Sequence, residues 1–247
     1  MKLALFADVH GNLEALNACL EHSRKSGADL HAFLGDFVGY GADPVAVVDI
    51  VAAHAQRGAI VVRGNHEQTV IDASSSRMNR DAEDAADWTR EQLGSAHRAF
   101  IEQLPLVARL DDMVFVHASA ASPEEFPYVR DTVRAAESLR AARSTYVFSG
   151  HVHEPALYCT APPNRIVAFT PFPGVAVSVP RHRQWLAIVG SAGQPRDGRP
   201  AACYAVADLE RRTLTFFRVP YDWHAAAAKI RAAGLPEVLA WRLERGE

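Results

Sequence analysis

Short apolar runs alternate with longer segments of helical period in the first third of the chain. The apolar runs cover residues 3–7, 30–34 and 60–62. Leucine or valine recurs at helical spacing after Asn12 and after Asp43-Pro44. Strands that alternate with helices in this way pair in parallel through crossover helices, and a run that is apolar at every position indicates a strand covered on both faces.

The pattern changes at about residue 67. Residues 67–104 are charged and rich in alanine at helical spacing, which predicts a helical insertion. Apolar runs resume around residues 107–110, 113–116 and 146–149 and predict three more strands. A helix capped by Asp131 lies between the last two.

Beyond residue 153 the helical period stops until near the end of the chain. Short apolar segments separated by Pro, Gly and Asp predict antiparallel strands and hairpins at residues 166–169, 175–179, 185–189, 204–207 and 214–219. Asp222 begins a terminal helix, at about residues 222–245, that breaks at Gly234-Leu235-Pro236. We therefore predict an α/β fold in a single domain, residues 1–247: a four-layer α-β-β-α sandwich of two mixed sheets flanked by helices, with a helical insertion.

Composition narrows the class of protein. With 247 residues, 49% of them hydrophobic, the chain can bury one large core. A formal net charge of −3 provides no general attraction to nucleic acid, which is not an expected partner. The first apolar run is too short for a signal peptide or a membrane span, and the three scattered cysteines form no CxxC pair. We expect a cytoplasmic protein with no membrane contact.

Polar residues of the kinds that bind metals follow the predicted strands at their carboxyl ends. They are Asp8, His10, Asp36, Asn65, His66, His117, His151 and His153. Ligands of open α/β sheets bind at this edge, so we expect these side chains to converge. Carboxylate and amide oxygens mixed with imidazole suit Mn, Fe, Zn, Co or Ni better than an all-oxygen calcium site.

Taken singly, each motif has a plainer interpretation. A Gly-Asp pair is usually a turn, and a His-x-His pair occurs by chance in a chain with 11 histidines. Five such motifs in order, each at a strand end, are much more specific. As an ordered set they resemble the calcineurin-like metallophosphoesterase superfamily, through Asp8-Val9-His10-Gly11-Asn12, Gly35-Asp36-Phe37-Val38, Gly64-Asn65-His66-Glu67, His117 and Gly150-His151-Val152-His153.

The remaining sequence resembles a small, bacterial, single-domain branch of this superfamily. The shared runs are residues 39–44, 190–198 and 219–222. The resemblance implies two divalent or mixed-valence transition metal ions. One would be bound by Asp8, His10 and His153, the other by Asn65, His117 and His151, and both by Asp36. It also implies a metal-activated hydroxide and identifies His66 as the general acid that protonates the leaving oxygen.

One departure from the family pattern bears on the substrate. Protein phosphatases of the superfamily carry an Asp-Arg pair where this chain has Gly39 and Tyr40, so His66 lacks a carboxylate partner from that loop and a bidentate phosphate clamp is missing. This argues against a protein phosphatase. Three further residues are candidates for substrate contacts, each with a structural alternative: Asn12 as a helix cap, Tyr40 as packing, and Arg196 as part of a constrained loop.

The residues therefore predict a dinuclear-metal-dependent hydrolase of phosphate esters or anhydrides. A phosphodiesterase acting on small nucleotide-like substrates competes with a small-molecule phosphatase as the specific activity. The alternative from another class is a non-catalytic, metal-binding interaction scaffold of the same fold, and its discriminating feature would be a missing ligand or a missing His66. The expected partner is a small phosphorylated molecule, and a homo-oligomer is compatible with the sequence.

Overall fold

Two six-stranded sheets form the centre of the molecule. The computed structural model describes residues 1–75, 78–163 and 165–247. The first sheet has the order β3-β2-β1-β11-β12-β9, in which β1, β2 and β3 are parallel and the other neighbours antiparallel. Its strands are β1 (Lys2–Phe6), β2 (Leu30–Leu34), β3 (Ile60–Val62), β9 (Ala176–Ser178), β11 (Ala202–Asp208) and β12 (Thr213–Val219).

The second sheet has the order β4-β5-β6-β10-β7-β8. Its strands are β4 (Val107–Leu110), β5 (Met113–Val116), β6 (Tyr146–Ser149), β7 (Ala156–Ala161), β8 (Arg165–Phe169) and β10 (Trp185–Ile188). Strands β5, β6 and β10 run parallel, whereas β4, β7 and β8 are antiparallel to their neighbours. Both sheets are therefore mixed, as the sequence predicts.

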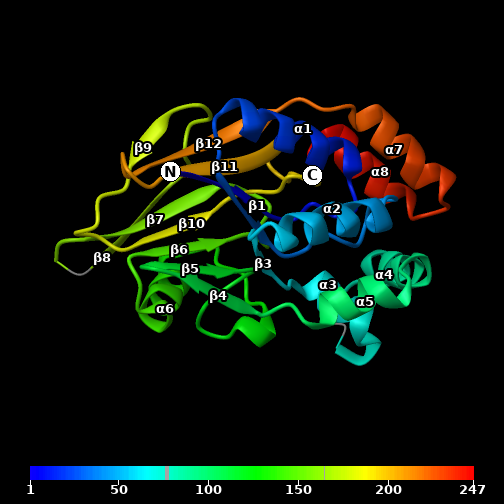
Figure 1. Ribbon diagram of the computed structural model, residues 1–247, viewed down its shortest axis with the longest axis horizontal. Helices are drawn as coiled ribbons and strands as arrows, with labels where there is room; N and C mark the ends of the chain where they lie inside the picture. The colour runs from blue at the N-terminus through cyan, green and yellow to red at the C-terminus, as the bar shows by residue number, and fades with distance from the viewer. Residues whose placement is uncertain (76–77, 164) are drawn as a thin grey trace.

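Some helices cover the outer faces of the sheets, and the others lie beyond the strand ends (Figure 1). The α-helices of the described chain are α1 (Leu13–Lys25), α2 (Pro44–Gln56), α3 (Asn65–Ile71), α4 (Arg80–Gln92), α5 (Ser95–Glu102), α6 (Thr132–Ala142), α7 (Trp223–Ala232) and α8 (Glu237–Arg245). Helices α1 and α2 pack on the first sheet, and α6 packs on the second. The layer order is therefore α-β-β-α, and the predicted fold class is confirmed.

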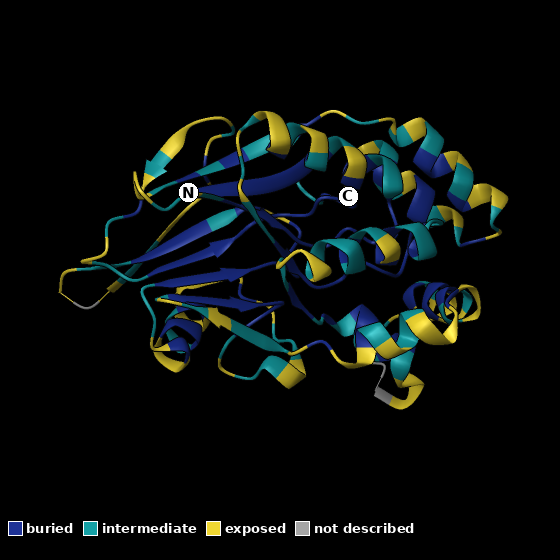
Figure 2. Ribbon diagram, viewed as in Figure 1, coloured by how far each residue is buried: buried dark blue, intermediate teal, exposed yellow. Residues whose placement is uncertain are grey.

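Alternation along β1 shows how one strand serves two layers. Leu3 and Leu5 are buried between the sheets, opposite Phe115 of the second sheet, whereas Ala4 and Phe6 are buried beneath α1 and α2. This is why the strand is apolar at every position from Leu3 onward. The strands at the centre of both sheets are buried along their length (Figure 2).

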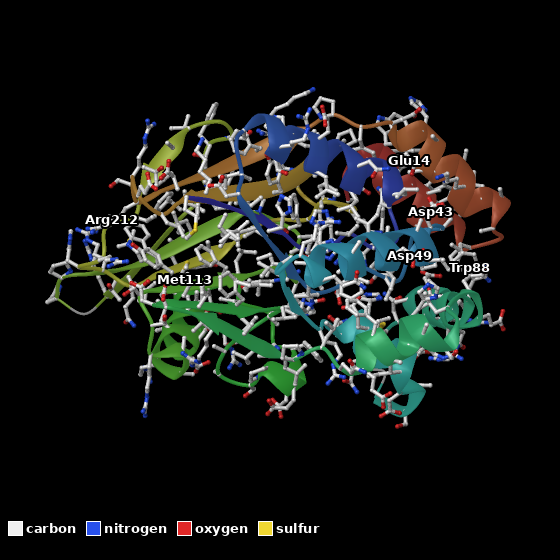
Figure 3. The ribbon with its side chains drawn as sticks, in the orientation of Figure 1. Glu14, Asp43, Asp49, Trp88, Met113 and Arg212 are labelled. Carbon is white, nitrogen blue, oxygen red and sulfur yellow. The ribbon has the colours of Figure 1, made fainter. Side chains whose placement is uncertain are left out.

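The two C-terminal helices are attached to the first sheet's helical layer through Lys229 of α7. Its ammonium lies 2.5 Å from a carboxylate oxygen of Glu14 and 2.8 Å from one of Asp43, so one side chain joins α7 to the starts of α1 and α2. Figure 3 labels both carboxylates beside these helices. Helix α8 packs against Tyr40 and α7, which brings the end of the chain close to the sheet edge that carries the polar motifs.

Three sequence expectations need correction. Strand β10 pairs antiparallel with β7, as expected for the later segments, but it also runs parallel to β6, a pairing that the sequence did not predict. Strand β7, whose run is interrupted by Thr160, was not predicted. The insertion begins with α3 at Asn65, slightly before residue 67, and residues 76–77 within it lie outside the described part of the chain.

Breaks and caps near the end of the chain agree with the sequence. The side chain of Asp222 accepts a hydrogen bond from the Ala225 amide, and a non-helical segment separates α7 from α8 at residues 234–236. Among the described residues, no helix combines the length and the apolar character that crossing a membrane requires.

Candidate metal centre

The polar motifs lie at one edge of the two sheets, where the parallel strands end. Asp8 follows β1, Asp36 follows β2, and His117 follows β5. Several of these turns need left-handed backbone geometry, with φ of 54° at Asp8 and 53° at Asp36. His10, His151 and His153 share this geometry, with φ of 50°, 67° and 67°.

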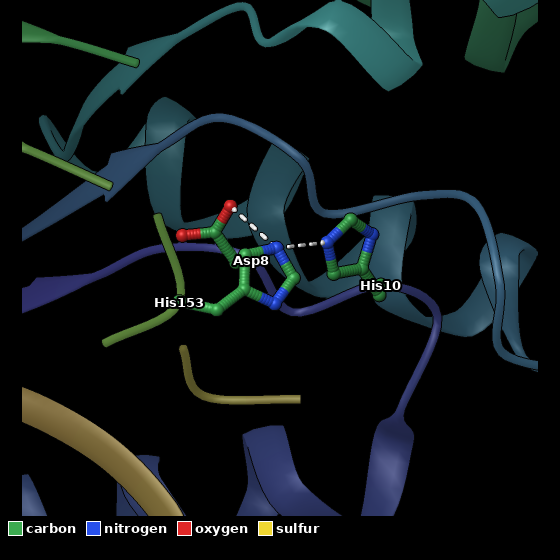
Figure 4. Close-up of side chains that lie close together, drawn as sticks. All are labelled: Asp8, His10 and His153. Carbon is green, nitrogen blue, oxygen red and sulfur yellow. Dashed lines mark hydrogen bonds and ion pairs between the residues drawn. The ribbon is translucent and has the colours of Figure 1, made fainter. Parts of the chain in front are cut away.

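Three of these side chains form the first cluster, defined as Asp8, His10 and His153 (Figure 4). The Nε2 atoms of His10 and His153 lie 3.1 Å apart, and Nε2 of His153 lies 3.4 Å from Oδ1 of Asp8. All three side chains are buried. One oxygen and two imidazole nitrogens therefore converge on a single point, as ligands of a transition metal do.

The second cluster is defined as Asp36, His117 and His151, and Asn65 lies beside it. Nε2 of His117 lies 3.1 Å from Oδ2 of Asp36, 3.0 Å from Nδ1 of His151 and 3.1 Å from Oδ1 of Asn65. This cluster offers two oxygens and two nitrogens. The donor set fits the same kinds of metal ion as the first cluster.

Asp36 belongs to the second cluster and is also close to the first. Its Oδ2 atom is 3.1 Å from Nε2 of His117 and 4.0 Å from Nε2 of His10. Its other oxygen accepts a hydrogen bond from the His66 amide at 2.9 Å. His10, Asp36 and His66 also have ligand atoms close enough to hold an ion, so His66 lies inside the group of polar side chains and not behind it.

Backbone carbonyls orient three of the imidazoles. Nδ1 of His10 donates to the Val38 oxygen at 3.1 Å, Nδ1 of His117 to the Leu34 oxygen at 2.8 Å, and Nδ1 of His153 to the Gln194 oxygen at 2.6 Å. Each bond fixes the tautomer and leaves Nε2 free for a metal. The imidazole of His151 presents Nδ1 instead, and its ring stacks on Tyr128 at 4.0 Å between centroids.

Glu67 fixes the backbone around Asp36. Its fully buried carboxylate accepts hydrogen bonds from the amides of Asp36, Val38 and Gly64 at 2.7, 3.0 and 2.8 Å. Burial, followed by the neighbouring Asp36, raises the pKa of Glu67 to about 7. Glu67 was not among the predicted site residues, although its position three residues after Gly64, at the start of a helix, is typical of a capping box.

The pKa shifts of the cluster residues are those expected of a site that binds a cation. Burial raises the pKa of Asp8 to about 8, and the neighbouring Asp36 adds to this rise. Burial acts to lower the pKa of His117, but Asp36 and Asp8 outweigh it and raise that pKa to about 9. Asp8 and His117 therefore hold protons that a bound cation would release, whereas at Asp36 burial is outweighed by the neighbouring histidines, which keep its pKa well below its usual value. Burial lowers the pKa of His10 and His153 and keeps them neutral, as ligands must be.

The imidazole of His66 fits in its position because residue 39 is glycine. A Cβ atom on Gly39 would lie 2.2 Å from Nδ1 of His66, and Gly39 has φ of 81°. Nδ1 of His66 is buried and has no hydrogen-bond partner among the described residues. Burial lowers the pKa of His66 to about 4.

The loop at residues 190–198 packs against the end of β1. The Gly193 amide donates to the Asp8 carbonyl at 2.9 Å, and a Cβ atom on Gly193 would lie 1.7 Å from the Val9 oxygen. The side chain of Asn12 makes two hydrogen bonds in the same region. Its Oδ1 caps α1 at the Ala15 amide, and its Nδ2 donates to the Gly193 oxygen at 2.8 Å. The capping alternative for Asn12 is what the structure shows, and the side chain is buried.

A cleft of about 690 Å³ opens above the clusters. The floor is made by side chains that include Asp36, Asn65, His66, His151 and His153. The walls come from other parts of the chain: the helical insertion, residues 124–128, Tyr40, Arg196 and Arg242. Tyr40 is nearly buried, and its ring centroid lies 4.5 Å from that of His10 and 4.4 Å from that of His66.

All eight predicted motif residues thus come together at one edge. Of the three candidate substrate contacts, Tyr40 and Arg196 line the cleft, while Asn12 lies behind the first cluster. Tyr128 and Arg242 also line the cleft and were not identified from the sequence. No motif marks them, because one lies in an irregular loop and the other on the polar face of the last helix.

Comparison with known proteins agrees with this geometry. Residues 1–212 match the family model of the calcineurin-like phosphoesterase superfamily domain. A relative, the uncharacterized protein MJ0912 of Methanocaldococcus jannaschii, is 30% identical over 99% of this chain and 98% of its own length.

Two solved structures share the whole fold. A metallophosphoesterase from Sphaerobacter thermophilus is 34% identical with a TM-score of 0.89, covering 100% of this chain and 99% of its own. The hypothetical protein PH1004 of Pyrococcus horikoshii shares the fold at 19% identity and a TM-score of 0.81, covering 100% of this chain and 98% of its own. This chain therefore belongs to the calcineurin-like phosphoesterase superfamily, a family of phosphoesterase enzymes, as its ordered motifs predict.

Proposed function

We propose that the protein hydrolyses phosphate esters or anhydrides of small, nucleotide-like molecules with two metal ions. The first ion would be held by Asp8, His10 and His153, and the second by Asn65, His117 and His151. Asp36 would bridge them. Two such ions would draw in the phosphoryl oxygens, offset their charge and supply hydroxide near neutral pH.

The observation that carries this proposal is the position of Asp36. One of its oxygens lies 3.1 Å from a nitrogen of the second cluster and 4.0 Å from a nitrogen of the first. A single carboxylate within reach of two complete clusters is the arrangement that a dinuclear centre needs. The cleft volume of about 690 Å³ also lies in the range of pockets that bind small ligands, roughly 300–1,000 Å³.

The residues around the clusters would have different roles: positioning, exclusion of water and proton transfer. The histidines oriented by backbone carbonyls would hold the two ions at fixed positions, since their rings cannot turn without losing a buried hydrogen bond. Tyr40 packs against His66 and His10 and excludes water from that side. Residue 66 would then deliver a proton to the leaving oxygen.

The acid role of His66 depends on the substrate. With a pKa of about 4 caused by burial, its imidazole is neutral at pH 7. An anionic phosphate bound beside the ring would raise this pKa and favour the protonated form. The proton would be used where the leaving group is a poor one, and would be dispensable where it is good.

The first test is hydrolysis of p-nitrophenyl phosphate and bis-p-nitrophenyl phosphate with added Mn²⁺, together with elemental analysis. We expect activity that depends on metal and two equivalents of bound metal. Metal bound without turnover of either ester would instead favour the scaffold alternative. The ratio of diester to monoester turnover would separate a phosphodiesterase from a phosphatase.

The second test is His66→Ala. It should keep the metal content and lower turnover by about 100-fold or more for an alkyl phosphate, but much less for p-nitrophenyl phosphate, because general acid catalysis contributes roughly 10²–10⁴-fold where the leaving group needs a proton. Equal losses on both substrates would mean that His66 binds substrate and does not act as an acid. Loss of metal would make it a ligand instead.

A further inference from the structure

Two guanidinium groups flank the ring of Tyr40 at the mouth of the cleft. The Cζ atoms of Arg196 and Arg242 each lie 5.9 Å from the Tyr40 ring centroid. They come from distant parts of the chain, the loop at residues 190–198 and helix α8. Both line the same cleft as His66 and His153.

Neither guanidinium is neutralised by an acid in the described part of the chain. Nη2 of Arg196 donates to the side-chain oxygen of Gln194 at 2.9 Å, and its Nε is buried without a partner. Arg242 forms no ion pair within the described residues, and Tyr40 is the aromatic ring it approaches. By contrast, Arg231 on the neighbouring helix pairs with Glu237 and Glu244. Unpaired guanidinium groups that line a cleft favour an anionic ligand.

The two arginines lie at different depths. Arg196 is next to the first cluster, because the residue that accepts its hydrogen bond, Gln194, also accepts one from Nδ1 of His153 at 2.6 Å. Arg242 belongs to α8, which packs against the outer side of Tyr40 and has no contact with a cluster residue among the hydrogen bonds and ion pairs of the described chain. The positive charge therefore extends from the clusters outward past Tyr40.

Two glutamates line the other wall of the cleft. Glu124 and Glu125 end the short 3-10 helix Pro123–Glu125, and the segment after it carries Phe126 and Tyr128, whose rings approach His117 and His151 at 5.8 and 4.0 Å. The one guanidinium that approaches the Tyr128 ring among the described residues, that of Arg130 at 4.9 Å, is not part of the cleft lining. The acidic wall thus adjoins the second cluster and the basic wall the first. An extra negative charge on a ligand in this cleft would be attracted towards Arg242 and repelled from Glu124 and Glu125.

We propose that Arg242, with Arg196, forms a second anion subsite that binds a phosphate of the substrate other than the one being hydrolysed. This rests on the proposed function and makes it more specific. The preferred substrate carries at least two phosphates, the scissile one on the clusters and the other beside Arg242, with an uncharged or aromatic group towards Tyr128.

Inhibition constants for inorganic phosphate and for imidodiphosphate, a non-hydrolysable ligand with two linked phosphoryl groups, test this on the metal-loaded protein with free Mn²⁺ held constant. Arg242→Gln should raise the inhibition constant of imidodiphosphate by about 10-fold, the loss of affinity typical of a charge-assisted hydrogen bond. The inhibition constant of inorganic phosphate should rise by less than about 2-fold. The matched control is Arg245→Gln, which removes the same charge from the same helix, because Arg245 lies over Trp241 and does not line the cleft.

Equal weakening of both ligands by Arg242→Gln would overturn the second subsite, since the arginine would then bind the phosphate on the clusters. No change for either ligand, or the same change in the Arg245→Gln control, would overturn it as well. Direct calorimetric binding of imidodiphosphate to the same variants keeps this result separate from the proposed function. If no ester is hydrolysed but Arg242→Gln alone weakens binding, the subsite stands and the hydrolase proposal fails.

Discussion

The floor and the walls of the cleft are built in different ways. The floor consists of residues at strand ends, and the groups around it are fixed by main-chain hydrogen bonds, such as those from His117 to the Leu34 oxygen and from the Asp36 amide to Glu67. The walls consist of side chains from an insertion, an irregular loop and the last helix. Tyr128 is 46% exposed, and Arg242 has no ion pair within the described residues.

This difference indicates which part of the site sets the chemistry and which part sets the choice of substrate. Buried groups with defined partners can hold metal ions and a reacting phosphate in one geometry. Partly exposed groups on separate segments can change without disturbing the strands beneath them. We therefore expect substitutions in the floor to reduce turnover of every substrate, and substitutions in the walls to act on some substrates only.

The largest effect is expected for Asp36→Asn. The amide is the same size but cannot bridge two cations through a charged oxygen, so turnover of p-nitrophenyl phosphate should fall by more than about 100-fold and the bound metal to one equivalent or less. Elemental analysis and steady-state rates would measure both. Asp49→Asn is the control, because Asp49 lies on the exposed side of α2, where it pairs with His97 (Figure 3). Full activity in Asp36→Asn would remove the basis for a bridged centre.

A smaller but general loss is expected for Glu67→Gln. The buried carboxylate accepts three backbone hydrogen bonds, and an amide turned either way leaves an N–H facing an N–H. Metal affinity or turnover should fall by roughly 10–100-fold. Stability should fall by about 1–3 kcal/mol, the cost of a buried donor without a partner.

Metal titration and denaturant unfolding would measure these two losses. The exposed Glu91→Gln on α4 supplies the control, with neither loss expected. Unchanged metal affinity in Glu67→Gln would mean that the Asp36 backbone is held by its strand alone, and the floor would be less dependent on hydrogen bonds than we infer.

The smallest and most selective effect is expected for Tyr128→Ala. Loss of the ring that stacks on His151 should leave metal content intact and raise KM for an aryl phosphate by about 3–10-fold, in line with 0.5–1.5 kcal/mol for a stacked pair. KM for methyl phosphate should change by less than about 2-fold, and Tyr128→Phe should restore the aryl preference. Equal changes for both substrates would show that Tyr128 supports the floor and does not select the substrate.

The same division explains what the sequence could predict. The strand ends at Asp8, Asp36 and His117 were predictable, because apolar runs locate parallel strands and parallel strands place their carboxyl ends at one edge. Strand β10 was predicted but its direction was not, since the direction depends on which strand it joins, β6, and no local pattern records that pairing. The arrangement of Arg242 beside Tyr40 depends on how α8 packs on the rest of the molecule, which is a long-range property.

Glu67 is an intermediate case. It is the last residue of the motif Gly64-Asn65-His66-Glu67, yet a glutamate early in a helix is ordinarily an exposed capping residue. Its role depends on the pairing of β2 with β3, which brings the Asp36 and Gly64 amides to one carboxylate. That pairing is a long-range contact, and no local sequence pattern predicts it.

The left-handed backbone at the metal-binding positions has a consequence for how this chain can diverge. Asp8, His10, Asp36, His151 and His153 all have positive φ, which costs an ordinary side chain about 1–2 kcal/mol and costs glycine or asparagine much less. A descendant that lost its metals would therefore fold better after replacing these residues, and glycine or asparagine would be the replacements retained. Valine and isoleucine should be rare there even when activity no longer matters.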